Sequence, residues 1–513
     1  MRAVPVAALV LLGLLGVLGV PFSAVPADVH DIFKHLKALQ AIADVHGSRS
    51  VAAGYNASAE YVLEELRQNG GFDVSTQPFV VPVYTEVELP SLSLPGASPS
   101  FQFHVCAQRT GWAHYESSCD ISGVRYGGNG KHDVKAHVVD VGSGCTQEDF
   151  THAKGLVAVA LVGQCEYIQI ASNAEDAGAA ALILFNPASA PGVPGGRVFA
   201  SETWQEGERL VDMPVIGATH TVASVLLQNQ ETAVHLTTHT RIELVHTYNI
   251  IAQTRAGDSR RVVMVGAHLD GVPEGPGIND NGSGTATVLA MALRLKQKGL
   301  KQGVRFAWWG AEEIGLLGSR HYVRSLLSGG RTDKLARIAL YLNFDMEASP
   351  NYIRLVYNGA EAEGEAKPGS EALQKMFQDF WNSKKLPYAL TGMTGGSDFL
   401  PFIQAGIPAS GLATGAGNFK TDAERKIHHG LANTPLDPCY HAPCDSIDNV
   451  SPLCISETSA AASDVLASLA YKELPLPLQT RRAVPASELN HRLSAVAGDD
   501  TTCVSSDEFE LAA

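Results

Sequence analysis

The stretch that decides the fold is residues 262–270, VVMVGAHLD. Its first half is a short apolar run, which suits a strand covered on both faces in a parallel or mixed sheet. It ends on His268 and Asp270, two side chains that can bind or orient a metal ion. Because open α/β sheets bind ligands at the carboxyl ends of their strands, this stretch predicts a functional site at that edge.

Two further apolar runs end in the same way. Residues 306–309, FAWW, precede Glu312 and Glu313, and residues 339–344, ALYLNF, precede Asp345. Taken singly, the glutamates could be a solvated helix start, where carboxylates favour the dipole, and the aspartate could be a strand-end cap. Three strands that bring such groups to one edge indicate an active site instead.

Loops supply the remaining candidates. Asp280 lies in residues 275–284, GPGINDNGSG, where glycine lets the backbone approach a bound group closely. His441, which alone could be an ordinary loop histidine, lies between two cysteines. Two imidazoles and three carboxylates make a donor set for two divalent metals that share one bridging carboxylate: His268, Asp280, Glu313, Asp345 and His441.

The surrounding segments alternate between strand and helix. We expect strands at 261–267, 303–309, 337–344 and 407–412, with helices at 284–298, 313–327 and 370–383. This order predicts an α/β fold with a mixed, mostly parallel sheet sandwiched by helices. Upstream we expect helices at 28–47 and 57–69, then strand-like runs over 72–95 that Pro82, Pro90 and Pro95 interrupt.

Residues 130–242 look like a separate module. A buried strand at 156–162 is followed by a turn, a helix at 168–178 and a second buried strand at 179–185. The alternative is an ordinary βαβ unit of the main sheet. We expect the main domain to comprise 28–129 and 243–475, and residues 476–513 to form a flexible tail.

Bulk composition excludes some classes of function. The chain has 513 residues, of which 45% are apolar and 18% charged, which are globular values. Its net charge of −15 argues against a nucleic-acid surface, which needs clustered lysine and arginine. Residues 1–27 resemble a secretory signal peptide, with a retained membrane anchor as the alternative.

Eight cysteines fit an oxidising compartment. Local pairing suggests three disulfides: Cys106–Cys119, Cys145–Cys165 and Cys439–Cys444. A zinc–cysteine site is the weaker alternative because the chain contains no CxxC pair. Sequons at Asn56 and Asn449 predict a glycoprotein.

Five motifs in this order resemble the secreted dizinc aminopeptidases, of the aminopeptidase Y and Streptomyces-type leucine aminopeptidase kinds. They are HLD at 268–270, the loop around Asp280, AEEIGLLGS at 311–319, NFDM at 343–346 and YH at 440–441. The pattern over 154–185 resembles the protease-associated domain found inserted in such enzymes. The resemblance implies a zinc-peptidase, phosphorylase/hydrolase-like fold and two Zn²⁺ per chain.

The resemblance also implies roles for individual residues. Asp280 would bridge the two zinc ions, with His268 and Asp345 completing one site and Glu313 and His441 the other. Glu312 would be the general base and Asp270 the carboxylate that orients the ring of His268. Tyr440 would stabilise the tetrahedral intermediate. The loops at 392–399 and 411–417 resemble those that line the family's substrate pocket.

We therefore expect a monomeric zinc aminopeptidase that acts on peptides with a free N-terminus. It would be secreted or in a vacuolar or lysosomal lumen, without nucleic-acid or membrane partners after signal cleavage. The alternatives are a carboxypeptidase or a glutaminyl cyclase on the same fold, or a non-catalytic binding ectodomain. The intact donor set favours the two-metal enzyme.

Overall fold

The computed structural model describes most of the chain between residues 28 and 475. The described ranges are 28–96, 101–105, 119–190, 192–199, 207–327, 332–393 and 395–475. The expected signal peptide and C-terminal tail lie outside these ranges. Within them, no helix is long and apolar enough to cross a membrane.

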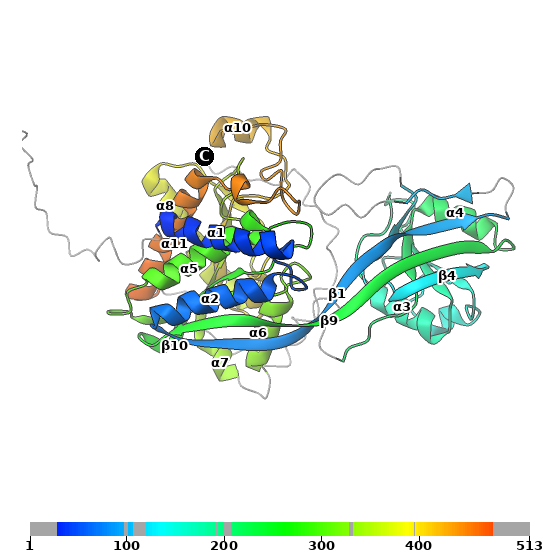
Figure 1. The fold of residues 1–513 in the computed structure, drawn as a ribbon, viewed down its shortest axis with the longest axis horizontal. Helices are drawn as coiled ribbons and strands as arrows, with labels where there is room; N and C mark the ends of the chain where they lie inside the picture. Colours follow the sequence, from blue (N-terminus) through cyan, green and yellow to red (C-terminus); the bar gives the residue numbers. More distant parts are fainter. Residues whose placement is uncertain are drawn as a thin grey trace, which may run out of the picture.

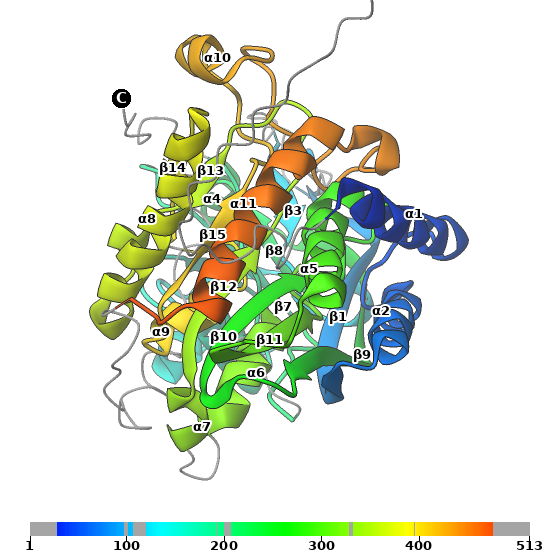
Figure 2. The same ribbon diagram turned by 90° about the vertical axis from the view of Figure 1, so that its left-hand side faces the viewer.

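A ten-stranded mixed sheet forms the centre of the main domain, and one end of it extends into the inserted module (Figures 1 and 2). Its strand order is β14 (Ala389–Thr391), β13 (Leu355–Tyr357), β15 (Ala409–Ala413), β12 (Ile338–Phe344), β10 (Asp258–His268), β11 (Gln302–Trp309), β9 (Val234–Thr254), β1 (Phe72–Leu94) and β2 (Phe101–Gln102), with β4 (Gly130–Ala136) paired to β9. At its centre β10 runs parallel to both β11 and β12, and β12 runs parallel to β15. The predicted mixed, mostly parallel sheet is confirmed.

Helices cover both faces of this sheet. One core contains residues of α1 (Val29–His46), α2 (Tyr55–Asn69), α5 (Gly284–Arg294), α8 (Lys367–Lys384) and α11 (Pro452–Tyr471). The other contains residues of α6 (Leu317–Leu327) and α9 (Leu400–Gln404). In β10, Val263 and Val265 face the first core and Met264 the second. This explains why residues 262–267 of the strand are apolar and do not alternate with polar residues.

The inserted module has its own five-stranded sheet. Its order is β3 (Ile121–Gly123), β8 (Val215–Ala218), β7 (Ala181–Phe185), β6 (Val157–Leu161) and β5 (Val138–Asp140), with helices α3 (Tyr167–Asp176) and α4 (His220–Gln228). It is not a βαβ unit of the main sheet. β3 belongs to this sheet because it pairs antiparallel with β8, although it lies before residue 130, where we expected the module to begin.

Two long strands join the module to the main domain. β1 and β9 pair antiparallel over most of their lengths and run from the main sheet into the module (Figure 1). β1 runs through Pro82 and Pro90, so the prediction that these two interrupt it is wrong, whereas the strand does end directly before Pro95. One side of β1 pairs with β9 along most of the strand. On the other side, within the described residues, β1 pairs only at Ser93 and Leu94, so Pro82 interrupts no hydrogen bonds between strands on that side. Pro90 lies where the register shifts between Glu88 and Ser91.

Two predicted disulfides are confirmed, Cys145–Cys165 and Cys439–Cys444. The predicted Cys106–Cys119 pair involves Cys106, which lies outside the described residues. Cys454 is a buried free thiol in α11. The second disulfide closes a five-residue separation around the histidine expected to bind metal, with Cα atoms 5.2 Å apart.

Candidate metal centre

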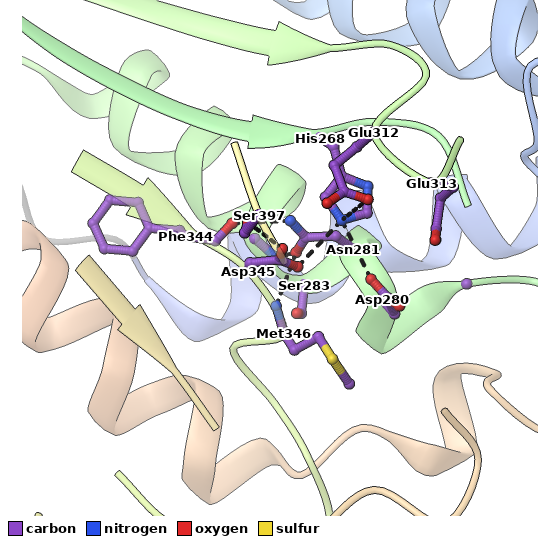
Figure 3. A network of polar contacts seen from close by, with 12 residues as sticks. His268, Asp280, Asn281, Ser283, Glu312, Glu313, Phe344, Asp345, Met346 and Ser397 are labelled. Carbon is purple, nitrogen blue, oxygen red and sulfur yellow. Dashed lines mark hydrogen bonds and ion pairs between the residues drawn. The ribbon is translucent and has the colours of Figure 1, made fainter. Parts of the chain in front are cut away.

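Adjacent strand ends carry the candidate side chains to one edge of the sheet. His268 is the last residue of β10 and lies in register with Trp309, the last residue of β11. Asp345 follows the end of β12, which is the neighbour of β10 on its other side. The three strand ends therefore meet where Figure 3 shows the side chains converging.

The glutamates that follow β11 are not on a helix. We expected the helix to begin at residue 313, but α6 begins four residues later, at Leu317. Ala311, Gly315 and Leu316 all have positive φ, which L side chains rarely adopt and a helix does not contain. The resulting turn places Glu312 and Glu313 at the strand end.

His268 faces three carboxylates with one ring nitrogen. Its Nε2 lies 3.2 Å from Oδ1 of Asp345 and 3.3 Å from Oδ1 of Asp280. Oε2 of Glu312 is 4.0 Å from the same nitrogen. The ring is only 1% exposed, so these charges interact with little screening by water.

Asp280 contacts a second imidazole with its other oxygen. Nε2 of His441 lies 3.1 Å from Oδ2 of Asp280 and 3.1 Å from Oε2 of Glu313. These are close approaches without hydrogen-bond geometry: Nε2 of His441 and Oε1 of Glu313 are buried atoms that make no hydrogen bond within the described part of the chain. Nitrogen and oxygen atoms that converge unpaired in this way fit metal ligation.

The electrostatics of the site also require positive charge. Burial alone would lower the pKa of both imidazoles, but the surrounding carboxylates raise the pKa of His268 and raise that of His441 to about 11. Burial raises the pKa of Glu312, and burial with repulsion from Asp280 raises the pKa of Glu313 to about 7. Four buried carboxylates against two imidazoles leave an excess of negative charge, which bound cations would neutralise.

The residues group into two sets that could each hold a cation. Their donor atoms lie within 4.8 Å of one another in the sets His268, Glu312, Asp345 and His268, Asp280, Glu313. The first set includes Glu312, the residue we expected to be the base and not a ligand. Imidazole and carboxylate donors of this kind suit zinc.

Asp270 makes a different contact from the one expected. Nδ1 of His268 is 3.1 Å from the backbone carbonyl oxygen of Asp270 and 3.8 Å from its carboxylate. The carboxylate instead accepts hydrogen bonds from the backbone N–H groups of Glu312, at 3.1 Å, and Glu313, at 3.3 Å. It therefore holds the turn that carries both glutamates, while the carbonyl orients the imidazole.

Tyr440 stacks on His441, with ring centroids 3.8 Å apart and planes inclined by 20°. Ser397, which sequence reasoning placed only in a pocket loop, donates to Oδ2 of Asp345 at 2.5 Å. Its hydroxyl fixes the carboxylate that faces His268, as Figure 3 shows. Sequence alone gives no signal for this contact, because Ser397 and Asp345 lie 52 residues apart.

The inserted module reaches the rim of the centre. Nη1 of Arg197 donates to the carbonyl oxygen of Ile314 at 3.2 Å, next to Glu313 in the sequence. A Cβ atom at Gly315 would lie 2.7 Å from that guanidinium nitrogen, so the turn and the arginine pack in close contact. The module therefore supports the turn that carries the glutamates.

Comparison with protein families matches both domains. Residues 249–466 match the model of peptidase family M28, and residues 134–226 match the PA domain. An aminopeptidase of Pseudomonas aeruginosa is 37% identical over 437 residues, covering 82% of this chain and 77% of that protein. A probable leucine aminopeptidase 2 of Arthroderma benhamiae is 30% identical over 490 residues, covering 91% and 89% respectively.

Solved structures share the fold. The aminopeptidase from Aneurinibacillus sp. strain AM-1 superposes with a TM-score of 0.64 at 20% identity, covering 89% of this chain and 97% of that one. A zinc aminopeptidase from Bacillus subtilis gives a TM-score of 0.55 at 23% identity, covering 90% and 99%. The arrangement of main sheet and inserted domain is thus found in solved structures.

Proposed function

Because this chain belongs to peptidase family M28, we propose that it removes N-terminal residues from peptides with water activated between two zinc ions. The chain is a metalloaminopeptidase: it belongs to this peptidase family, its relatives over most of its length are named aminopeptidases, and it shares the fold of a zinc aminopeptidase. The number of ions, the role of each residue and the place where the enzyme works are the parts that we propose.

One observation carries the proposal of two ions. The two oxygens of the Asp280 carboxylate face different imidazoles, Oδ1 toward His268 at 3.3 Å and Oδ2 toward His441 at 3.1 Å. This is the arrangement that a bridging carboxylate needs. Asp345 would complete the ligands on the side of His268, and Glu313 those on the side of His441.

The reaction follows from the residues around this bridge. Zinc ions, when bound, lower the pKa of a water that they share and polarise the scissile carbonyl. Glu312 lies beside the donor set, accepts the proton of the attacking water and passes it to the leaving amine. Glu312 and Asp345 together attract the free α-ammonium group of the substrate. This contact would align the first peptide bond with the bridge.

Tyr440 donates a hydrogen bond to the developing oxyanion in this account. Tyr440→Phe keeps the ring that stacks on His441 but removes the hydroxyl, so we expect kcat to fall by about 10²- to 10³-fold with KM little changed. Steady-state kinetics on a leucine anilide would measure this. Tyr388→Phe serves as the control, since Tyr388 lies just before β14, away from the donor set. A wild-type kcat in Tyr440→Phe would remove Tyr440 from the reaction.

Blocking the substrate's α-amine tests the proposed specificity. N-acetylation removes the positive charge that Glu312 and Asp345 would attract, so we expect cleavage of an N-acetylated peptide to be undetectable under conditions that cleave the free peptide. Mass spectrometry of the products measures this. Amidation of the C-terminus is the matched control and should leave N-terminal release intact. Cleavage that survives acetylation and stops on amidation would indicate a carboxypeptidase.

We further propose that the enzyme is secreted or works in a vacuolar or lysosomal lumen, as a monomer. The disulfides Cys145–Cys165 and Cys439–Cys444 support an oxidising compartment.

A fungal relative named probable leucine aminopeptidase 2 matches 91% of the chain, which supports leucine and similar apolar residues as the first N-terminal residues to test in substrates.

A further inference from the structure

A fully buried arginine lies under the loop that presents Asp280. Arg49 is 0% exposed and belongs to the segment between α1 and α2, about two hundred residues before the part of the chain that matches the peptidase family. Burying an ion without partners is costly, so such a residue is expected to be held by several hydrogen bonds. Nothing in the proposed reaction uses it.

The guanidinium of Arg49 binds three backbone carbonyls. Its Nε donates to Pro276 at 3.0 Å, Nη1 donates to Leu269, and Nη2 donates to Gly277. Leu269 directly follows His268, whereas Pro276 and Gly277 begin the turn that leads to Asp280. One rigid, planar group therefore ties the backbone beside one candidate ligand to the backbone beside another.

A buried carboxylate holds the same loop from its amide side. Asp445, 1% exposed, accepts hydrogen bonds from the backbone N–H groups of Asn279, at 2.8 Å, and Asp280, at 3.0 Å. Asp445 directly follows Cys444, which closes the loop that carries His441. The loop is thus held between Arg49, which donates hydrogen bonds to its carbonyls, and Asp445, which accepts hydrogen bonds from its amides.

The loop itself is shaped to fit against the arginine. Gly277 has φ of +64°, and a Cβ atom there would lie 3.1 Å from Nη2 of Arg49 and 2.5 Å from the carbonyl oxygen of Asp280. Burial lowers the pKa of Arg49, while the nearby carboxylates, Asp445 foremost, oppose this effect. An arginine stays charged in proteins. Burial raises the pKa of Asp445 to about 8, and each of its two oxygens accepts a hydrogen bond from a loop amide.

We propose that Arg49 is a positioning residue that, with Asp445, sets the separation between His268 and Asp280 and thereby the affinity of the site for zinc. This inference rests on the proposed function in requiring a metal at these ligands. It makes the N-terminal segment part of the metal site, although no residue of that segment would touch a metal. Residues that orient metal ligands from outside typically change metal affinity by about 10- to 100-fold when replaced.

Arg49→Lys tests the proposal in the full-length protein. Lysine keeps the charge but offers a single nitrogen, which cannot reach three carbonyls in the fixed fork of a guanidinium. We expect the apparent zinc Kd, measured by competition with a chelator, to rise by about 10- to 100-fold. We also expect the visible absorption spectrum of the Co²⁺-substituted protein to change, because it reports the geometry of the ligands.

Arg354→Lys is the matched control. Arg354 is similarly buried, at 7% exposure, but its guanidinium binds Glu457, Tyr352 and the carbonyl of Pro387, away from the metal loop. It should lower the melting temperature as Arg49→Lys does and leave the zinc Kd and the Co²⁺ spectrum at wild type. If Arg49→Lys behaves like this control, the proposal is overturned, while two zinc ions in the wild type would leave the proposed function standing.

Asp445→Asn is the second variant, which serves if Arg49→Lys does not fold. It keeps the size of the side chain but weakens the hydrogen bonds to the amides of Asn279 and Asp280. We expect its zinc Kd to rise. In the double variant with Arg49→Lys, we expect the fold-increase in zinc Kd to be smaller than the product of the two single fold-increases, because both residues act on one loop. A wild-type zinc Kd in Asp445→Asn would overturn the proposal that Arg49 and Asp445 together position the loop.

Discussion

Replacing Glu312 with glutamine is expected to lower kcat by about 10²- to 10⁴-fold without reducing the zinc content of the protein. The amide has the shape of the carboxyl group but cannot accept the proton of the attacking water. Kinetics on a leucine anilide and elemental analysis of the same preparation measure both quantities. The variant also decides a question that the geometry leaves open, because Glu312 groups with His268 and Asp345 as a possible third ligand.

Glu424→Gln is the control for this experiment. Glu424 is also buried, at 8% exposure, but it caps helix α10 (Asp422–His428) by accepting from Thr421, which a glutamine oxygen can also do. It should keep wild-type kcat and zinc content. Loss of zinc in Glu312→Gln would make Glu312 a ligand, and substantial residual turnover with full zinc would remove it from the role of base.

The second large effect is expected at the bridge. Asp280→Ala removes the carboxylate that faces both imidazoles, so we expect both ions to be lost or bound much more weakly. Because bound ions supply several kcal/mol of transition-state stabilisation, activity should fall by about 10³-fold or more. Elemental analysis after dialysis and the kcat of the dialysed protein measure this outcome.

His441→Ala gives the contrasting result. It removes a donor from one side of the bridge only, so the His268 side should keep its ion and the protein should bind about one zinc ion. Urea unfolding of both variants checks that neither is globally unfolded. Equal zinc contents in Asp280→Ala and His441→Ala would contradict the bridging role of Asp280.

Much of the site could be predicted from the sequence, because strands determine where their last side chains point. His268 and Asp345 follow apolar runs, and adjacent parallel strands bring such ends together whatever the loops do. The family resemblance was predictable because each of its motifs is a short run of residues, and the two disulfides because each joins cysteines close together in the sequence. The family and the two disulfides are confirmed by the comparisons and the fold.

What could not be predicted depends on contacts between distant segments. Arg49 reaches carbonyls that lie 220 to 228 residues away, and no local pattern marks it as different from a surface arginine. The turn at Glu312 reads as a helix start because its glutamates suit one. Instead, Ala311 and Leu316 have positive φ, and the segment between them forms a turn. The carboxylate of Asp270 holds this turn by accepting hydrogen bonds from the backbone N–H groups of both glutamates.

The number of zinc ions per fully active chain tests the account most directly. Apo protein prepared with a chelator would be titrated with zinc while bound metal and kcat are both followed. We predict that full activity is reached at about two equivalents and that the ligands of both ions include Asp280. Full activity at a single equivalent, with no further change on adding a second, would contradict the pair of zinc ions bridged by Asp280.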